Sequence, residues 1–294
     1  MYDTVGMEWI RVSVALVLEG GGTRGAYTAG VLDVFLENGI AFPSVYGVSA
    51  GACNAMSYIS KQYRRNKVIF QKYVCDKRYL SMANLRKTGS LFGFGFIFGE
   101  MSHELLPFDY KTFFASPVDF RVGATNIETG KAVFFSKEDL RTSMDAVRAS
   151  ASLPMISPIV EFNGYRLLDG GVSDPIPVEQ SMRDGNERNV LVLTRDASYR
   201  KSARPEFPVP VIKSVYRKYP KLVEAMTARS ERYNNQLELC RRLESQGKAF
   251  IIRPSSPVLT SRYEKDPVKL MELYYRGVRD ARRKRKELQE FLQG

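Results

Sequence analysis

Short apolar segments that alternate with helical patterns are the feature that most constrains this chain. Residues 12–18 read V-S-V-A-L-V-L, a β-branched run typical of a fully buried strand. A glycine-rich turn follows, and apolar side chains then recur at helical spacing up to Gly39, where the helix is expected to stop. Residues 44–48 and 50–59 repeat the order of strand and helix. This alternation predicts an α/β fold with a mostly parallel sheet.

The same alternation returns later in the chain. Strands are predicted at residues 118–126, 131–135, 165–169, 189–194 and 249–252, and a helix at 138–150. Between them, residues 61–115 break the pattern and are expected to form an irregular inserted cap. The chain ends in a basic amphipathic helical pattern over residues 272–292, with one buried stripe. We therefore expect a core over residues 12–180, and a region over 181–294 that completes this core and adds basic helices.

Composition bounds the compartment and the partners. The three cysteines, Cys53, Cys75 and Cys240, form neither a disulfide framework nor a zinc-binding spacing, so a reducing compartment is expected. The first residues lack the apolar core of a signal peptide, and no apolar run reaches the ~18 residues of a membrane-spanning helix. We expect a cytoplasmic protein. The net charge of +12 is compatible with binding to anionic lipid at the inner face of a membrane or to nucleic acid, or with a merely solvated basic surface.

The glycine turn at residues 20–25 fits two chemistries. Gly20, Gly22 and Gly25 match G-x-G-x-x-G between a strand and a helix, which is the setting of a dinucleotide-binding turn. Such a turn needs an acidic residue at the end of the next strand for the ribose, whereas that strand runs into Val48 and Ser49. Glu19, directly before the glycines, would also repel a pyrophosphate.

The second chemistry is an oxyanion site. Consecutive glycines allow backbone N–H groups to point into one space near a helix N-terminus, and such a nest stabilises an anion. A simple tight turn would need fewer glycines. We expect the nest to be the loop of residues 20–25, formed by Gly20, Gly21, Gly22, Thr23, Arg24 and Gly25.

Residues 47–51 read G-V-S-A-G, the G-x-S-x-G pattern of a nucleophile on a sharp strand-to-helix turn. Ser49 would be the nucleophile, and Gly47, Ala50 and Gly51 would allow the backbone to turn. The pattern is also compatible with an ordinary serine cap on the following helix. The predicted strand before it and the small residues after it favour the nucleophile.

A serine nucleophile needs a base, and this chain contains one histidine. His103 lies in the insert, where no strand end presents it, and is expected to be a surface residue. Asp169 ends a predicted strand and is followed by two glycines, a position where α/β sheets carry functional residues. Asp174 is its rival, although Asp174-Pro175 also fits plain turn chemistry. We predict a Ser49–Asp169 dyad without a metal or other cofactor.

Four segments together resemble the patatin-like phospholipases. These are L-E-G-G-G-T-R-G-A-Y-T-A-G-V-L at residues 18–32, Y-G-V-S-A-G-A-C-N-A at 46–55, R-A-S-A-S-L-P-M-I-S-P at 148–158 and L-L-D-G-G-V-S-D-P-I-P at 167–177. They occur in family order, and the resemblance covers about residues 12–180. One departure is Asp174-Pro175-Ile176-Pro177, where family members often carry Asn before the last proline.

The resemblance implies a three-layer α/β/α fold and hydrolysis of lipid acyl esters. Carried over to this sequence, Ser49 is the nucleophile, Asp169 the base, and the backbone of residues 20–23 the oxyanion site with Arg24 beside it. Phospholipids or other lipid esters are the implied substrates. The open alternatives are a nucleotide-binding protein that uses Gly20–Gly25 and a catalytically silent lipid-binding module.

The basic surplus is concentrated in the insert. Residues 61–87 contain nine Lys and Arg residues against one Asp, with aromatic residues between them, and residues 89–99 alternate Gly with Phe. This composition favours a lid at an anionic lipid surface. Single-stranded nucleic acid binds similar patterns, but no nucleic-acid-binding motif accompanies this one, so no nucleic acid is expected. The phenylalanines could equally be core residues. The sequence assigns no oligomeric state.

Overall fold

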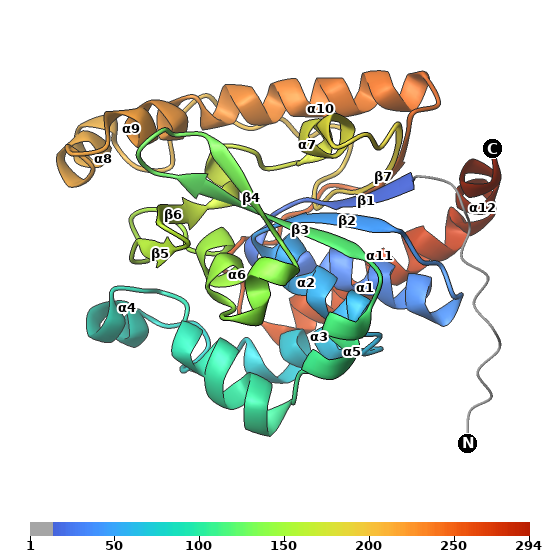
Figure 1. Ribbon diagram of the computed structural model, residues 1–294, viewed down its shortest axis with the longest axis horizontal. Coiled ribbons are helices and arrows are strands. Elements are labelled where there is room, and N and C mark those ends of the chain that lie inside the picture. Colours follow the sequence, from blue (N-terminus) through green and yellow to red (C-terminus); the bar gives the residue numbers. More distant parts are fainter. Residues whose placement is uncertain (1–13) are drawn as a thin grey trace.

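A mixed β-sheet with helices on both faces organises the chain (Figure 1). The computed structural model describes residues 14–294. Seven strands run in the order β5-β6-β3-β2-β1-β7-β8, and β4 pairs with β3 beside this path. The strands β3, β2, β1, β7 and β8 are parallel, whereas β4, β5 and β6 are antiparallel to their neighbours. The predicted three-layer α/β/α fold is confirmed.

The strands follow the predicted segments closely. Residues 12 and 13 of the first predicted strand lie outside the described residues. The short strand β5 was not predicted. The observed strands are β1 (Val14–Leu18), β2 (Ser44–Val48), β3 (Asp119–Asn126), β4 (Ala132–Ser136), β5 (Val160–Phe162), β6 (Tyr165–Asp169), β7 (Arg188–Val192) and β8 (Ala249–Ile252).

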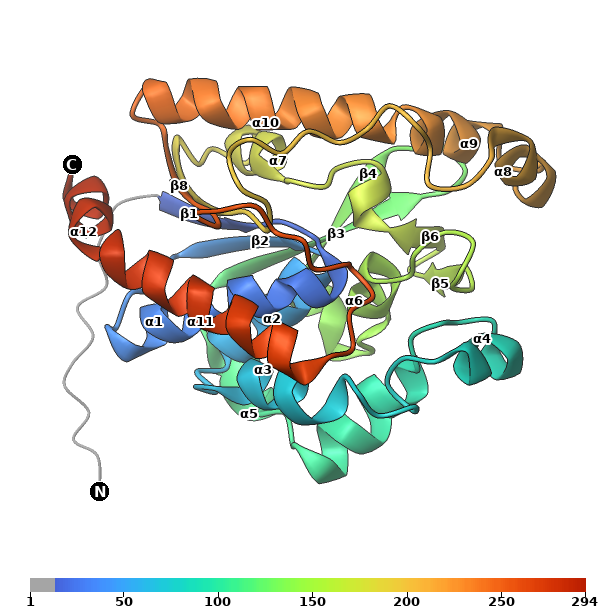
Figure 2. The ribbon, with the colours of Figure 1, turned by 180° about the vertical axis from the view of Figure 1, so that it is seen from behind.

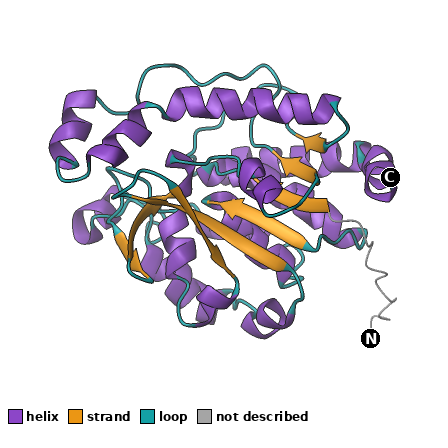
Figure 3. Cartoon of the chain, turned by 45° about the horizontal axis from the view of Figure 1, so that its top comes forward, coloured by secondary structure: helices purple, strands orange, loops and turns teal. Residues whose placement is uncertain are grey.

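Helices form the two outer layers (Figure 1 and Figure 2). One face of the sheet carries α7 (Val178–Arg183), α8 (Val209–Val215), α9 (Pro220–Thr227) and α10 (Arg229–Ser245). The other carries α1 (Gly25–Glu37), α2 (Ala50–Ile59), α6 (Asp145–Ser150) and α11 (Pro267–Arg283). Figure 3 separates the layers by colour, with the orange strands between purple helices.

The burial pattern of β1 explains its continuous apolar sequence. Val14, Leu16 and Leu18 face the helices α1, α2 and α11, whereas Ala15 and Val17 face α10. All five side chains are buried. A strand that is covered on both faces has no polar side, so it does not show the alternation of a half-exposed strand.

Three sequence expectations need correction. The insert at residues 61–115 is not irregular but helical, with α3 (Arg65–Val68), a π-helical turn (Ile69–Tyr73), α4 (Met82–Thr88), a π-helical segment (Phe96–Leu105) and α5 (Tyr110–Ala115). Its helices are short and interrupted, as at Gly89 with φ 73° and at Gly99, where the backbone is non-helical. They therefore show no sustained helical period.

The other two corrections concern helix continuity. The predicted helix at 138–150 is a 3-10 turn (Glu138–Arg141) followed by α6, because local bonds of Thr142 and Ser143 to the backbone compete with helix formation. The C-terminal pattern at 272–292 forms two helices, α11 and α12 (Arg285–Gln293), which meet at Lys284. Among residues 14–294, no helix is both long and apolar enough to cross a membrane.

The strand β3 brings two sequence-distant strand ends together. Its residues Asp119–Gly123 pair with β2, and its residues Ala124–Asn126 pair with β6. The strand β4 pairs with residues of β3 from both of these ranges, so it must lie along the other edge of β3. The strands β2 and β6 therefore share one edge of β3 and meet end to end. Their last residues, Val48 and Asp169, lie opposite the consecutive residues Gly123 and Ala124.

The helices α1 and α11 cross at two glycines. A Cβ atom on Gly30 would lie 2.1 Å from the carbonyl oxygen of Tyr274, and one on Gly277 would lie 2.2 Å from that of Tyr27. Reciprocal hydrogen bonds flank this crossing, from Tyr27 to Asp280 (3.2 Å) and from Tyr274 to the carboxylate of Asp33 (2.7 Å). The C-terminal helix is thus bound closely against the first helix of the core.

We predict that Gly277→Ala destabilises the protein by about 1–3 kcal/mol, the usual cost of overpacking, because the new methyl group would collide with backbone of α1. Gly95→Ala is the matched control, since a Cβ atom there meets nothing within 4 Å. Urea unfolding midpoints provide the measurement. Equal midpoints for the two variants would contradict the close packing of α1 and α11.

Candidate active site

Ser49 lies on a sharp turn between β2 and α2. Its backbone has φ 55° and ψ −125°, a conformation that non-glycine residues rarely adopt and that is often found at functional sites. A Cβ atom on Gly47 would lie 2.7 Å from the Cα of Ala52, and one on Gly51 would lie 2.4 Å from the carbonyl oxygen of Leu18. The turn therefore requires both glycines of the G-x-S-x-G segment.

Asp169 meets Ser49 at the junction of β6 and β2. The Ser49 hydroxyl donates a hydrogen bond of 2.7 Å to Oδ2 of Asp169, and the Gly171 N–H donates one of 2.7 Å to Oδ1. Both Ser49 and Asp169 are buried. Burial raises the pKa of Asp169 above its ordinary value, whereas the Arg229 charge and the two hydrogen bonds act in the opposite direction.

Ser150 is a site residue that the sequence did not single out. Its hydroxyl accepts a hydrogen bond of 2.7 Å from the Ser49 N–H and donates one of 2.6 Å to the carbonyl of Gly123. It thereby ties the turn to β3. Ser150 ends α6 and belongs to the R-A-S-A-S segment of the family resemblance. That segment was the sequence feature that could have identified it as a site residue.

The glycine loop at residues 20–25 lies beside Ser49. Gly22 has φ 58°, and a Cβ atom on it would lie 2.4 Å from the carbonyl oxygen of Arg262. The Gly20 and Thr23 amides already donate to the carbonyls of Pro175 (3.4 Å) and Arg262 (3.0 Å). These two amides are therefore not free to bind an anion, although the sequence predicted them as donors. Within residues 14–294, no protein acceptor engages the amides of Gly21, Gly22 and Ala50.

Glu19 supports this loop from inside the fold. Its carboxylate accepts hydrogen bonds from the Tyr233 hydroxyl (2.8 Å) and the Thr194 N–H (2.6 Å), and burial raises its pKa. Arg24 is also buried, and its pKa falls to about 10 because of desolvation and the nearby charges of Arg195 and Arg262. The sequence analysis placed Arg24 beside the loop but assigned no supporting role to Glu19.

The two rival bases lie elsewhere. Asp174 is buried and accepts a hydrogen bond of 2.6 Å from Gln236, and its pKa is raised to about 7 by burial. His103 is exposed on the cap, with its ring stacked on Tyr110 at 5.6 Å. Neither side chain is hydrogen-bonded to Ser49. In the described part of the chain, no group of three or more His, Cys, Asp or Glu side chains is arranged to hold a metal ion.

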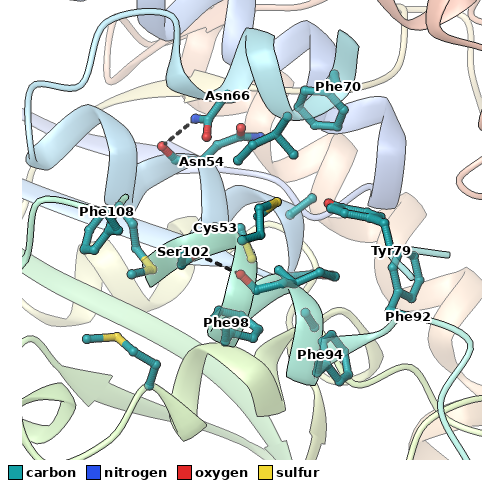
Figure 4. A pocket seen from close by; sticks show the side chains of 18 of the residues that line it. Cys53, Asn54, Asn66, Phe70, Tyr79, Phe92, Phe94, Phe98, Ser102 and Phe108 are labelled. Atoms are coloured by element: carbon teal, nitrogen blue, oxygen red, sulfur yellow. Dashed lines mark hydrogen bonds between the residues drawn. The ribbon is translucent and has the colours of Figure 1, made fainter. Parts of the chain in front are cut away.

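An apolar cavity of about 110 Å³ opens on one side of Ser49 (Figure 4). The cap supplies most of its wall, and α2 supplies Cys53 and Asn54. The Gly/Phe segment thus contributes Phe92, which is buried, and Phe94 and Phe98, which are partly buried, to the cavity. The main apolar lining consists of Ile69, Phe70, Tyr79, Phe92, Phe94, Ile97, Phe98, Met101, Phe108, Met144 and Leu153.

A polar cavity of about 260 Å³ opens on the other side of Ser49. Asp169 and the glycine loop form part of its wall. The remaining wall comes largely from residues 195–206 and from the C-terminal region. Five cationic side chains line it: Arg24, Arg195, Lys201, Arg229 and Arg262.

Comparison with known proteins supports a family assignment. The family model for patatin-like phospholipases matches residues 16–182, more than half of the 294 residues. A second model, for a domain of unknown function, matches residues 219–293. The chain is 14% identical to VipD from Legionella pneumophila, with a TM-score of 0.43 over 92% of this chain and 66% of that one.

Relatives by sequence include bacterial and fungal proteins. The uncharacterized protein YjjU of Escherichia coli is 30% identical over 62% of this chain and 52% of its own length. An uncharacterized NTE-family protein of Mycobacterium tuberculosis is 26% identical over 74% and 59%, respectively. A lysophospholipase NTE1 of Cryptococcus neoformans is 28% identical over 61% of this chain but 11% of its own length. This chain spans about half of the first relative. It belongs to the patatin-like phospholipase family.

Proposed function

We propose that this protein is a serine hydrolase that cleaves the acyl ester bonds of lipids with a Ser49–Asp169 dyad. The observation that carries the proposal is the hydrogen bond of 2.7 Å from the Ser49 hydroxyl to Asp169, in a buried site between an apolar and a polar cavity. Family membership supports lipid esters as the substrate class.

The chemistry follows from these contacts. Ser49 Oγ attacks the ester carbonyl while its proton moves to Oδ2 of Asp169. In the part of the chain that the structure describes, the amides of Gly21, Gly22 and Ala50 have no acceptor. The glycine loop and the start of α2 orient them, so they are candidate donors to the oxyanion. The tetrahedral intermediate then collapses, and the leaving alcohol takes the proton from Asp169. Water cleaves the acyl-enzyme by the same proton transfers in a second round.

Asp169 can act without histidine because of its surroundings. An exposed aspartate has a pKa of about 3.9 and is a weak base at neutral pH. Burial raises the pKa of Asp169, which makes its carboxylate a stronger proton acceptor. The Gly171 N–H fixes the other carboxylate oxygen, so that Oδ2 remains directed at Ser49.

The end of β2 argues against the nucleotide-binding alternative. This strand ends at Val48 and is followed by Ser49, where a ribose-binding acid would be required. The silent lipid-binding module remains a matter for experiment, because it predicts binding without turnover.

We predict that a fluorophosphonate probe labels the wild-type protein and fails to label Ser49→Ala, because only an activated serine reacts. Ser81→Ala is the matched control, since Ser81 also caps a helix, α4, but lies outside both cavities. The readout is the mass of the labelled protein. Equal labelling of Ser49→Ala and wild type would refute the dyad, and absence of labelling in all three proteins would favour the silent module.

We predict an acid limb in the pH profile of kcat/KM, measured with a soluble neutral ester. Activity requires ionised Asp169, so it falls as pH decreases through a pKa that lies above the ordinary value of about 3.9. Arg229→Met moves this limb to higher pH, because the Arg229 charge lowers the pKa of Asp169. His103→Ala is the control and leaves the limb in place. A limb that disappears in His103→Ala would instead assign the base to histidine.

We also propose that the cap binds an anionic membrane surface. Lys72, Lys77, Arg86 and Lys87 are exposed on the cap, together with Met82. Arg65 is an exception among the basic residues of this segment, because it is buried and bonded to Ser102 and Leu106.

Reversing Lys77, Arg86 and Lys87 to Glu should weaken binding to phosphatidylglycerol vesicles by at least about tenfold, since each base near such a surface contributes roughly 1 kcal/mol. Hydrolysis of a soluble ester should not change. The matched control reverses three exposed basic residues around α8, namely Lys213, Arg217 and Lys218. If both triple variants sediment with vesicles as the wild type does, the cap is not the membrane-binding surface.

A further inference from the structure

The two cavities beside Ser49 differ in chemistry and meet at the same atoms. Gly22, Ser49 and Leu153 line both of them. The cavity on the cap side is enclosed largely by aliphatic and aromatic side chains (Figure 4). The opposite cavity is lined by five cations. A substrate with its ester at Ser49 would therefore have an apolar part on one side and a polar part on the other.

The cations of the polar cavity exceed the anions that pair with them. Glu206 lies 3.4 Å from Arg229 and 3.2 Å from Arg262. Over residues 14–294, the other three cations, Arg24, Arg195 and Lys201, form no ion pair with a carboxylate.

Two of these cations have buried polar atoms that no described residue engages. The Nε atoms of Arg24 and Arg195 are buried and make no hydrogen bond within residues 14–294. Arg24 itself is 8% exposed. Leaving a buried charged donor unpaired is costly, which adds to the cost of holding these positive charges together.

Repulsion among the cations of the polar cavity also favours a bound anion. Burial and the charges of Arg229, Arg262 and Arg24 lower the pKa of Lys201 to about 7 despite the opposing effect of Glu206. A bound anion would relieve this repulsion. Arginine binds phosphate oxygens through paired N–H groups, and lysine binds them as a point charge.

We propose that the polar cavity binds the phosphate of the substrate head group, so that the enzyme acts on phospholipids whose phosphate carries no compensating amine. This inference rests on the proposed function, since it places the cleaved ester at Ser49. The acyl chain occupies the apolar cavity, and the phosphate contacts Arg24, Arg195 and Lys201. The segment at residues 219–293, which matches a domain of unknown function, contributes Arg229 and Arg262 to this cavity.

The test measures binding to Ser49→Ala, which cannot turn over, by isothermal titration at lipid concentrations below micelle formation. The probes share one acyl chain: lauroyl lysophosphatidic acid, lauroyl lysophosphatidylcholine and monolauroylglycerol. We expect lysophosphatidic acid to bind at least about tenfold more tightly than the other two. Equal affinities for the three lipids would overturn the proposal. Inorganic phosphate is the fourth probe, and if it bound as tightly as lysophosphatidic acid the cavity would be a site for free anions instead.

A second set of variants assigns the effect to the cavity. Lys201→Met, in the Ser49→Ala background, should lose most of the preference for lysophosphatidic acid, and Lys201→Arg should retain it. The Asn234 side chain bonds only to backbone atoms of Lys201, so these substitutions leave both hydrogen bonds intact. Lys286→Met removes an exposed charge on α12 and is the matched control. A preference that survives in Lys201→Met would contradict the assignment.

The outcomes separate the two proposals. Selective binding of lysophosphatidic acid by Ser49→Ala, without fluorophosphonate labelling of the wild type, would keep the anion site and reject the hydrolase. Labelling of the wild type with equal affinity for all three lipids would keep the hydrolase and reject the anion site.

Discussion

The end-to-end meeting of β2 and β6 on one edge of β3 is the constraint on which the site depends. Val48 and Asp169 lie opposite neighbouring residues of β3, so the register of a single strand sets the distance between the Ser49 turn and the carboxylate. The junction tolerates no side chain at Gly170, because a Cβ atom there would lie 2.2 Å from the Gly123 carbonyl oxygen. The hydrogen bond between Ser49 and Asp169 is therefore fixed by sheet geometry rather than by a mobile loop.

Burial of the strand junction also sets the acid–base properties of Asp169. The same packing that closes the junction removes water from Asp169 and raises its pKa. Ser150 holds the Ser49 backbone through one hydroxyl, and the Arg262 carbonyl holds the Thr23 amide. The Ser150 contact stabilises the strained turn at Ser49, whose φ of 55° would otherwise be unfavourable. The residues around the turn thus offset its strain and keep the Ser49 hydroxyl directed at Asp169.

Features set by residues close together in the chain could be predicted from the sequence, whereas contacts between distant segments could not. The strand, turn and helix around Ser49 follow from glycines and small residues within a few positions of one another, so the pattern is complete in the sequence. The position of Asp169 followed from the end of an apolar strand. The contact of Arg229 with the Gly171 carbonyl (2.8 Å) spans 58 residues and has no local signal. The helices of the cap were missed because their apolar side chains line a cavity and do not form a regular stripe.

The C-terminal segment supports the loops of the site at three points. Arg262 accepts from Thr23, Arg229 donates to Gly171, and Tyr233 donates to Glu19. The match to the family model ends at residue 182, yet each of these contacts crosses that boundary. The end of the family-model match therefore does not separate the site from the segments that support it. Exchanging this segment between relatives would transplant the contacts that hold the glycine loop and the Gly171 turn, together with the helices.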